Sequence, residues 1–500
     1  MPQGKIKKGF FFYFGLFVLL LIAIFLIILV ILMFNPGKTI LWFQYFTAGD
    51  SYVITETTDT SQGINLSSSS NITNIEVECS YADVRIQKSN EVRQDAIIIE
   101  NNAKGFALAS DAREFSYSVT LSGNTLNIEV IEPTGFIYIS DDITITINIF
   151  FNEDYGTSSG DFSNFGFNIS TTSGNVDIGA STNNNQTISP RAITAETTSG
   201  SIIFRSCTQI DTIQSLSLTT DNGGIQTIGN NVTYNGEEAS GFVLNSGTIN
   251  LRTTRGTIDL DVVKINEGGT LEILNDRGNV VIDNIEVDNI NVNCYEGNYL
   301  LGDIICNEFS FTPSEDRIAS PNIQIESLTG TFIISSRSTD YIANPDITIQ
   351  KLTGSANIQN ISGSININEL DGYAYAIVQN GSINISYASQ SSYTNDNNIT
   401  ATGNASVTVN FLGEFINSLR VITENGNINF NVKNNTAFVA NSFVNDGTNY
   451  GETGEVPAFL DDSKISTNIG TEDKNPLMIG DGTRGTINIY TNGNVSFNLV

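Results

Sequence analysis

Carboxylates offer the most direct route to chemistry in this 500-residue chain, because it contains no histidine. Two Asp-Asp pairs occur, Asp141-Asp142 and Asp461-Asp462. Two carboxylates are the usual catalytic pair in glycoside hydrolysis, one as general acid and the other as base or nucleophile. Apart from Lys464, neither pair has a basic residue close by in the sequence. Solvated loop charge is the stronger interpretation, so we predict no catalytic residue and no enzymatic activity.

The composition excludes several other kinds of site. Without histidine there is no Ser-His-Asp or Cys-His nucleophile pair and no His-ligated metal. There are 53 acidic and 23 basic residues, a formal charge of −30, which argues against a nucleic-acid partner. The chain also lacks the Asp-x-Asp-x-Asp-Gly pattern of a calcium loop. We therefore predict no cofactor and no metal site.

The four cysteines are too few and too scattered for a zinc site or a disulfide-dense scaffold. Cys294 and Cys306 lie twelve residues apart, a spacing that could bring them onto neighbouring strands. They could form a disulfide in an oxidising compartment, or they could be two buried thiols. Both interpretations are open at this stage.

The N-terminal part predicts a membrane anchor. Residues 9–34 contain no charged side chain and are long enough to cross a bilayer as a helix. Lys5, Lys7 and Lys8 precede this segment, so the positive-inside rule places residues 1–8 in the cytoplasm. A cleaved signal peptide is the alternative, but its apolar region would be shorter.

The residues after the span look extracytoplasmic. Trp42 and Tyr45 are typical of an interfacial aromatic belt, within a juxtamembrane stalk predicted over residues 35–71. Only one acidic residue, Asp50, lies among the first fifty, so nearly all of the negative charge belongs to the predicted exterior. We expect a single-pass protein with its bulk at the cell surface.

The exterior divides into two β regions. Residues 72–160 predict an N-terminal β module or cap, including a hairpin over residues 116–131 that turns at Ser122-Gly123-Asn124. Residues 161–500 predict β-solenoid repeats, interrupted by a loop excursion at 437–480. The last strand runs almost to Val500, and no cap for it is visible in the sequence.

A short unit recurs through the second region. It consists of a small or polar residue, a glycine, and then a strand with Ile, Val or Phe at alternate positions. The glycines at 174, 200, 224 and 247 follow one another at intervals of 26, 24 and 23. The corner glycines predicted from this unit are Gly174, Gly200, Gly247, Gly256, Gly278, Gly330, Gly363, Gly381, Gly426, Gly485 and Gly493.

A period near 23 residues made of short alternating strands is typical of a solenoid. Glycine would supply the positive φ needed where each coil turns. Alternation would bury the apolar residues and expose Asn, Ser and Thr, which could stack in ladders along the rod. The prediction is an all-β fold, a parallel β-solenoid (β-helix) with an N-terminal β module, preceded by one transmembrane helix. An array of immunoglobulin-like sandwiches is the alternative, but it would need more frequent hairpin turns.

The exterior resembles the adhesin-like β-strand-repeat family of membrane-anchored surface proteins. The resemblance rests on the opening strands around 75–87, the strand at 143–149, the recurring Ser-Gly-x-Ile/Val unit and the closing strands at 480–487 and 491–495. It covers residues 72–500. It implies a parallel β-solenoid at the cell surface and no catalytic residues.

The expected function is adhesion, recognition or surface structure without catalysis. Expected partners are the membrane, surface glycans or proteins, and a second copy of the chain through the open C-terminal edge of the solenoid. Two alternatives remain: a carboxylate-based polysaccharide-active enzyme, and an envelope-stress sensor acting through a membrane partner.

Overall fold

A computed structural model describes most of residues 57–500 and a short N-terminal piece. The described residues are 17–24, 57–61, 72–80, 82–89, 96–101, 105–107, 116–131, 136–138, 145–152, 166–181, 190–205, 213–229, 232–313, 320–335, 344–388, 396–403, 405–433, 436–445, 458–468, 475–479 and 485–500.

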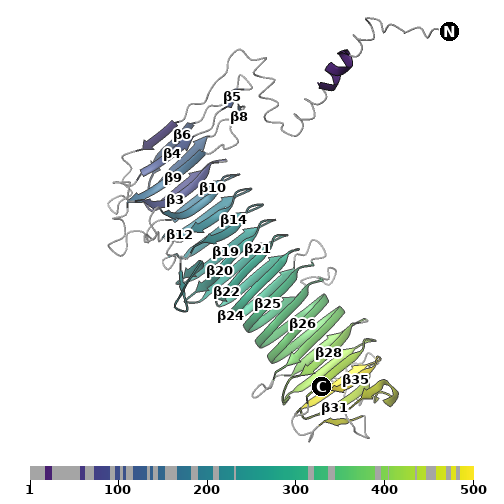
Figure 1. Cartoon of the computed structure of the whole chain (residues 1–500). Coiled ribbons are helices and arrows are strands. Elements are labelled where there is room, and N and C mark those ends of the chain that lie inside the picture. Colours follow the sequence, from purple (N-terminus) through teal and green to yellow (C-terminus); the bar gives the residue numbers. More distant parts are fainter. Residues whose placement is uncertain are drawn as a thin grey trace, which may run out of the picture.

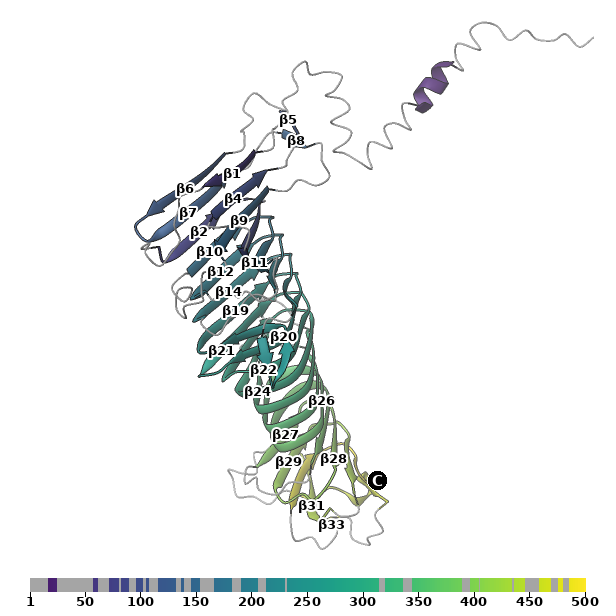
Figure 2. The ribbon, with the colours of Figure 1, turned by 60° about the vertical axis from the view of Figure 1, so that its left-hand side comes forward.

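These residues form a nearly all-β, solenoid-like fold in which coils of chain stack along one axis (Figure 1). Each coil places a strand on a first side and another on a second side, and both pair in parallel with the coils above and below (Figure 2). The parallel, repetitive part of the prediction is therefore confirmed. Alternating apolar residues explain it, because one coil cannot bury them without its neighbours.

The first side contains a continuous ladder. From the N-terminal end its strands are β6 (Ser116–Ser122), β7 (Thr125–Ile131), β2 (Asn74–Glu78), β10 (Gly166–Thr171), β12 (Ala192–Thr197), β14 (Ser215–Thr220), β19 (Gly247–Thr253), β21 (Gly269–Asn275), β23 (Asn289–Cys294), parts of β24 (Asn298–Pro313), β25 (Asn322–Ser335) and β26 (Asp346–Tyr387), then β27 (Asn397–Ala401), β29 (Ser418–Thr423), β34 (Thr486–Thr491), β31 (Phe438–Val444) and β33 (Leu477–Ile479).

The second side runs beside the first. Its strands are β1 (Thr57–Ser61), β4 (Ala96–Asn101), β9 (Ile145–Asn152), β3 (Asp83–Ser89), β11 (Val176–Ser181), β13 (Ile202–Arg205), β15 (Ile225–Ile228), β20 (Ile258–Ile265), β22 (Val280–Glu286), the other parts of β24, β25 and β26, then β28 (Ser406–Phe411), β30 (Ile428–Val432), β35 (Val495–Leu499) and β32 (Ile465–Thr467).

In the middle of the stack the second side bends, which adds a short third side. β18 (Gly241–Leu244) pairs there with the second half of β20, from Val262 to Ile265. Two hairpins lie outside the stack: β16 (Val232–Tyr234) with β17 (Glu237–Ala239), and β5 (Gly105–Ala107) with β8 (Phe136–Tyr138).

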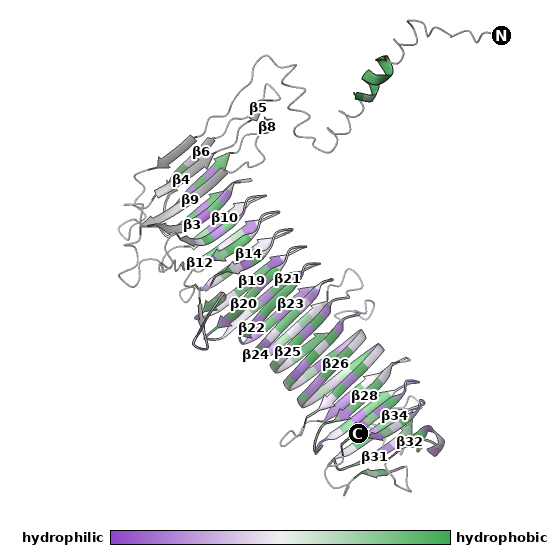
Figure 3. Ribbon diagram, in the orientation of Figure 1, coloured by the Kyte–Doolittle hydropathy of each residue, from purple (hydrophilic) through white to green (hydrophobic). Residues whose placement is uncertain are grey.

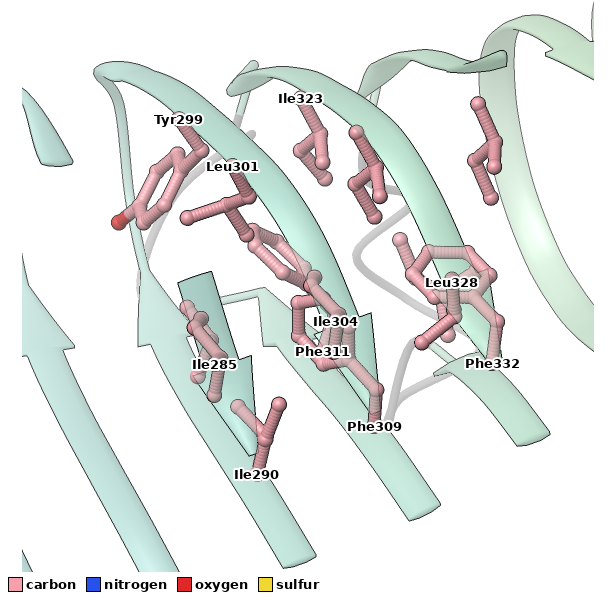
Figure 4. Packing of buried hydrophobic residues seen from close by; sticks show 14 of the residues in the cluster. Ile285, Ile290, Tyr299, Leu301, Ile304, Phe309, Phe311, Ile323, Leu328 and Phe332 are labelled. Atoms are coloured by element: carbon pink, nitrogen blue, oxygen red, sulfur yellow. The ribbon is translucent and has the colours of Figure 1, made fainter. Parts of the chain in front are cut away.

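One hydrophobic core runs inside the coils. In β23, buried and exposed residues alternate, and buried residues likewise alternate with more exposed ones in β12 and β14. Hydrophobic and hydrophilic residues alternate along the strands of the stack (Figure 3). Rings of successive coils pack edge to face, as for Phe309 and Phe332, whose centroids are 5.5 Å apart, and for Tyr299 and Phe311, at 5.4 Å (Figure 4). The outward positions are then free to be polar.

The N-terminal end of the stack is closed by antiparallel strands. The predicted hairpin is confirmed as β6 and β7, with Ser122 opposite Thr125. The first coil, β2 and β3, belongs to the parallel stack and lies between this cap and β10 and β11. Residues 74–89 are thus repeat-like, although the sequence grouped them with the N-terminal module.

The C-terminal end differs from the prediction. The excursion at 437–480 contains β31, a 3-10 helix at Asp462–Lys464, β32 and β33. The last strand is not an open edge, because β35 pairs with β30 on one side and with β32 on the other. The cap was not predicted because the capping strands, β31 and β32, come earlier in the sequence than β34 and β35, the strands that they cover.

The predicted membrane anchor falls mostly outside the described residues. Residues 17–24 are α-helical and exposed. Within the described ranges, no helix is long and apolar enough to cross a membrane. The rest of the 9–34 segment, together with Lys5, Lys7, Lys8, Trp42 and Tyr45, lies outside those ranges, so the anchor stays a prediction.

Candidate functional site

The described acid pair caps a turn. Asp461 precedes the 3-10 helix, and its Oδ1 accepts the backbone N–H of Ser463 at 2.8 Å. That bond lowers the pKa of Asp461. Lys464 donates its Nζ proton to the carbonyl oxygen of Asn492 at 2.8 Å. Asp461 therefore has a local structural role as the cap of this turn, and Asp141-Asp142 lies outside the described residues.

The two cysteines for which a disulfide was one of two interpretations lie far apart. Cys294 ends β23 at one corner of its coil, whereas Cys306 sits at the opposite corner, just before the strand segment that pairs with β23. The length of β23, about 16 Å, separates them, and a disulfide needs Cα atoms within about 7 Å. Both are free, buried thiols, and burial raises the pKa of each. The disulfide is therefore not formed.

The predicted corner glycines fall into two columns along the stack. Gly247, Gly330 and Gly485 lie where a coil enters the first side. The other column lies where the chain leaves the first side for the second. Its members from the prediction are Gly174, Gly200, Gly256, Gly278, Gly363, Gly381, Gly426 and Gly493.

Close approach of coils, rather than positive φ, explains most of these glycines. Only Gly247, Gly330, Gly363 and Gly381 among them have a left-handed φ. A Cβ on Gly200 would instead lie 1.8 Å from the carbonyl oxygen of Gly174. The prediction that glycine supplies positive φ is thus wrong for the remainder. The column also passes through Gly223 rather than Gly224, because Gly256 contacts the carbonyl oxygen of Gly223.

A buried threonine precedes several of these glycines by three residues, and its role was not predicted from the sequence. Thr197 Oγ1 accepts the N–H of Gly200 at 3.0 Å and donates to the carbonyl oxygen of Gly174 at 3.1 Å. Thr220 repeats this arrangement one coil later. The hydroxyl thereby satisfies both backbone groups at the corner. The recurring Thr-x-x-Gly spacing was the signal that could have revealed it.

Outward asparagines form ladders, as the sequence suggested. Along one corner, Asn298 Nδ2 donates to Asn279 Oδ1 at 3.1 Å, and Asn322 Nδ2 donates to Asn298 Oδ1 at 3.3 Å. A second, partly buried ladder near the C-terminal end links consecutive amides at 2.7 to 3.3 Å; its members are Asn384, Asn410, Asn431 and Asn498. Each amide keeps hydrogen-bonding capacity for a ligand or for water.

A recess lies in the outer surface where the second side bends. Gly302 occupies the bend position of its coil, between Asp283 in the preceding coil and Glu326 in the next. A groove of about 420 Å³ is lined by Gly302 and by the two carboxylates. A Cβ on Gly302 would lie 2.1 Å from the carbonyl oxygen of Asp283, so the backbones of these two coils approach closely at the floor of the groove. The groove is further lined by Val281, Leu300, Leu301, Gln324, Ile325 and Gln350.

The groove is acidic. Partial burial raises the pKa of Asp283, and the charges of Asp261 and Asp259 raise it further. Carboxylates and amides with an adjacent exposed apolar side chain, Leu300, suit a ligand with both hydroxyl groups and C–H faces. In the part of the chain that the structure describes, no group of three or more Cys, Asp or Glu is placed to hold a metal ion.

No protein-family model, curated protein or solved structure matches this chain.

Proposed function

We propose that this protein is a membrane-anchored, adhesin-like rod that presents a repetitive surface outside the cytoplasm and binds surface glycans or proteins without catalysis. The resemblance of residues 72–500 to adhesin-like repeats and the uncharged segment at 9–34 support this proposal. The negative charge of the predicted exterior keeps such a rod soluble and repels nucleic acid.

The ladders of outward amides are the observation that carries the proposal. A parallel stack repeats each outward position at about 4.8 Å, so one side-chain type recurs as a regular array. Asn279, Asn298 and Asn322 form such an array along an exposed corner. A polymeric ligand can contact many equivalent positions of this kind, and weak contacts then add up to useful affinity.

The test uses the full chain reconstituted in liposomes. These are incubated with a glycan array and with native cell-surface material, and bound partners and released reducing sugars are both measured. Retention of a glycan or protein without sugar release is expected. If nothing is retained in either format, the recognition role is refuted and only a structural rod remains.

The groove over Gly302 favours a second candidate, a carboxylate-based polysaccharide-active enzyme. Asp283 and Glu326 are two coils apart, about 10 Å along the stack, close to the carboxyl separation of inverting glycosidases. Asp283, with its raised pKa, would be the acid and Glu326 the base. Sugar release that is lost in D283N and in E326Q, but kept in D303N, would support this activity. Release unaffected by either substitution would refute it.

A further inference from the structure

The last coil of the chain is interleaved between earlier segments. β34 lies between β29 and β31, and β35 lies between β30 and β32. The chain therefore passes from β30 directly to β31 across a space one coil wide. Residues 485–500 fill this space, which we call the slot.

The coil in the slot is held on both faces. Ile422 pairs with Tyr490 on one side, and Phe443 pairs with Tyr490 on the other. Its inward side chains are fully buried, and the Phe497 ring stacks on Phe430 at 5.0 Å. Without the coil, four strands that precede it in sequence would expose unpaired edges and apolar side chains.

The tip around the slot also exposes large apolar side chains. Phe459 is 54% exposed beside Phe443, and Met478, on the outermost strand of the first side, is 52% exposed. The two side chains lie near opposite ends of β31, since Phe459 bridges to Phe443 and Met478 pairs with Val439. A second copy of the same tip supplies matching apolar residues.

We propose that two copies of this chain associate tip to tip by exchanging this coil, so that residues 485–500 of one copy fill the slot of the other. The slot accepts any copy of the segment in the same register, and the buried contacts are unchanged by the exchange. Only five residues separate β33 from the coil, and five residues reach at most about 17 Å, so the exchange requires the two C-terminal tips to be in contact. This contact differs from pairing through an open edge.

The test is cysteine cross-linking between differently tagged full-length chains. Asn441 and Asn488 are register partners across the slot, and Asn441 Nδ2 donates to Asn488 Oδ1 at 3.1 Å. N441C carrying one tag is co-expressed with N488C carrying another, and the product is oxidised and separated without reduction. The matched control is N298C with N322C, register partners in the middle of the stack.

Exchange predicts a mixed disulfide dimer with both tags from N441C and N488C, and none from the control pair. Dimers of a single variant should not form, because Asn441 faces Asn488 and not another Asn441. The double variant N441C/N488C in one chain should cross-link within the chain, which checks the pairing itself. No mixed dimer despite that internal cross-link would overturn the exchange, and failure of the internal cross-link would overturn the slot.

Discussion

A Cβ atom on Gly223 would lie 1.8 Å from the carbonyl oxygen of Gly200 in the preceding coil. The same relationship recurs along the corner column, where Gly200 approaches Gly174 and Gly256 approaches Gly223. Glycine is thus required because the backbones of successive coils touch at this corner. Any side chain there would push two coils apart.

Replacement of Gly223 by alanine should destabilise the stack by about 2 kcal/mol or more, because overpacking against backbone cannot be relieved by a side-chain rotation. Gly224 is the matched control. A Cβ on it would meet only the carbonyl oxygen of Thr257, at 3.4 Å, so G224A should be nearly neutral. Urea unfolding of the full chain in detergent, followed by circular dichroism, measures both. Equal midpoints for the two variants would contradict the close-approach explanation.

The repeat could be recognised from sequence because alternation and recurring glycine are local signals. The reason why glycine is needed at the corners could not be predicted, because the backbone φ and the distance between coils depend on how the coils stack. The order of the coils at the C-terminal end was also hidden. Strands such as 428–432 and 495–499 share the same alternating pattern, so sequence alone does not decide which coil lies next to which. The groove over Gly302 could not be predicted either, because it is formed by residues of successive coils that meet at one bend, and the sequence of a single coil does not show which residues these are.

Two fully buried tyrosines should respond in opposite ways to loss of their hydroxyl. Among the described residues the Tyr387 hydroxyl has no hydrogen-bond partner, although its ring packs on Phe411 and Phe415. Y387F removes a buried unsatisfied group and should be neutral or stabilising by up to about 1 kcal/mol. The Tyr299 hydroxyl donates to the carbonyl oxygen of Asn275 at 3.3 Å, so Y299F should cost about 1 kcal/mol. Thermal unfolding midpoints measure both, and a loss of stability in Y387F would show that its hydroxyl is satisfied.

The acidic groove should make stability depend on pH through Asp283. Because the folded-state pKa of Asp283 is raised above its ordinary value, the ionised group disfavours folding. This penalty is fully present above the folded pKa and is relieved as the pH falls toward the ordinary aspartate range. D283N should therefore be more stable than the native chain at pH 7, with a gap that closes on acidification. D303N removes the same charge where Asp303 accepts a hydrogen bond from Ser327, and it serves as the control. A gap that widens in acid would reverse the assigned sign.

The stability of the C-terminal cap, strands β31, β32 and β33, should depend on the buried ring of Phe497 in the interleaved coil. Phe497 is fully buried and stacked on Phe430, so F497A should cost about 3 to 5 kcal/mol through the cavity that it leaves. Because β35 is the only described neighbour that joins β32 to the stack, the loss should reach residues 465–467 as well as the last coil. Hydrogen exchange measured by mass spectrometry should show faster exchange in 438–445 and 465–467 and unchanged rates near β12. F459A, which truncates an exposed ring beside Phe443, should leave both regions protected. If exchange in F497A rises only within 495–499, the cap stands independently of the coil beneath it.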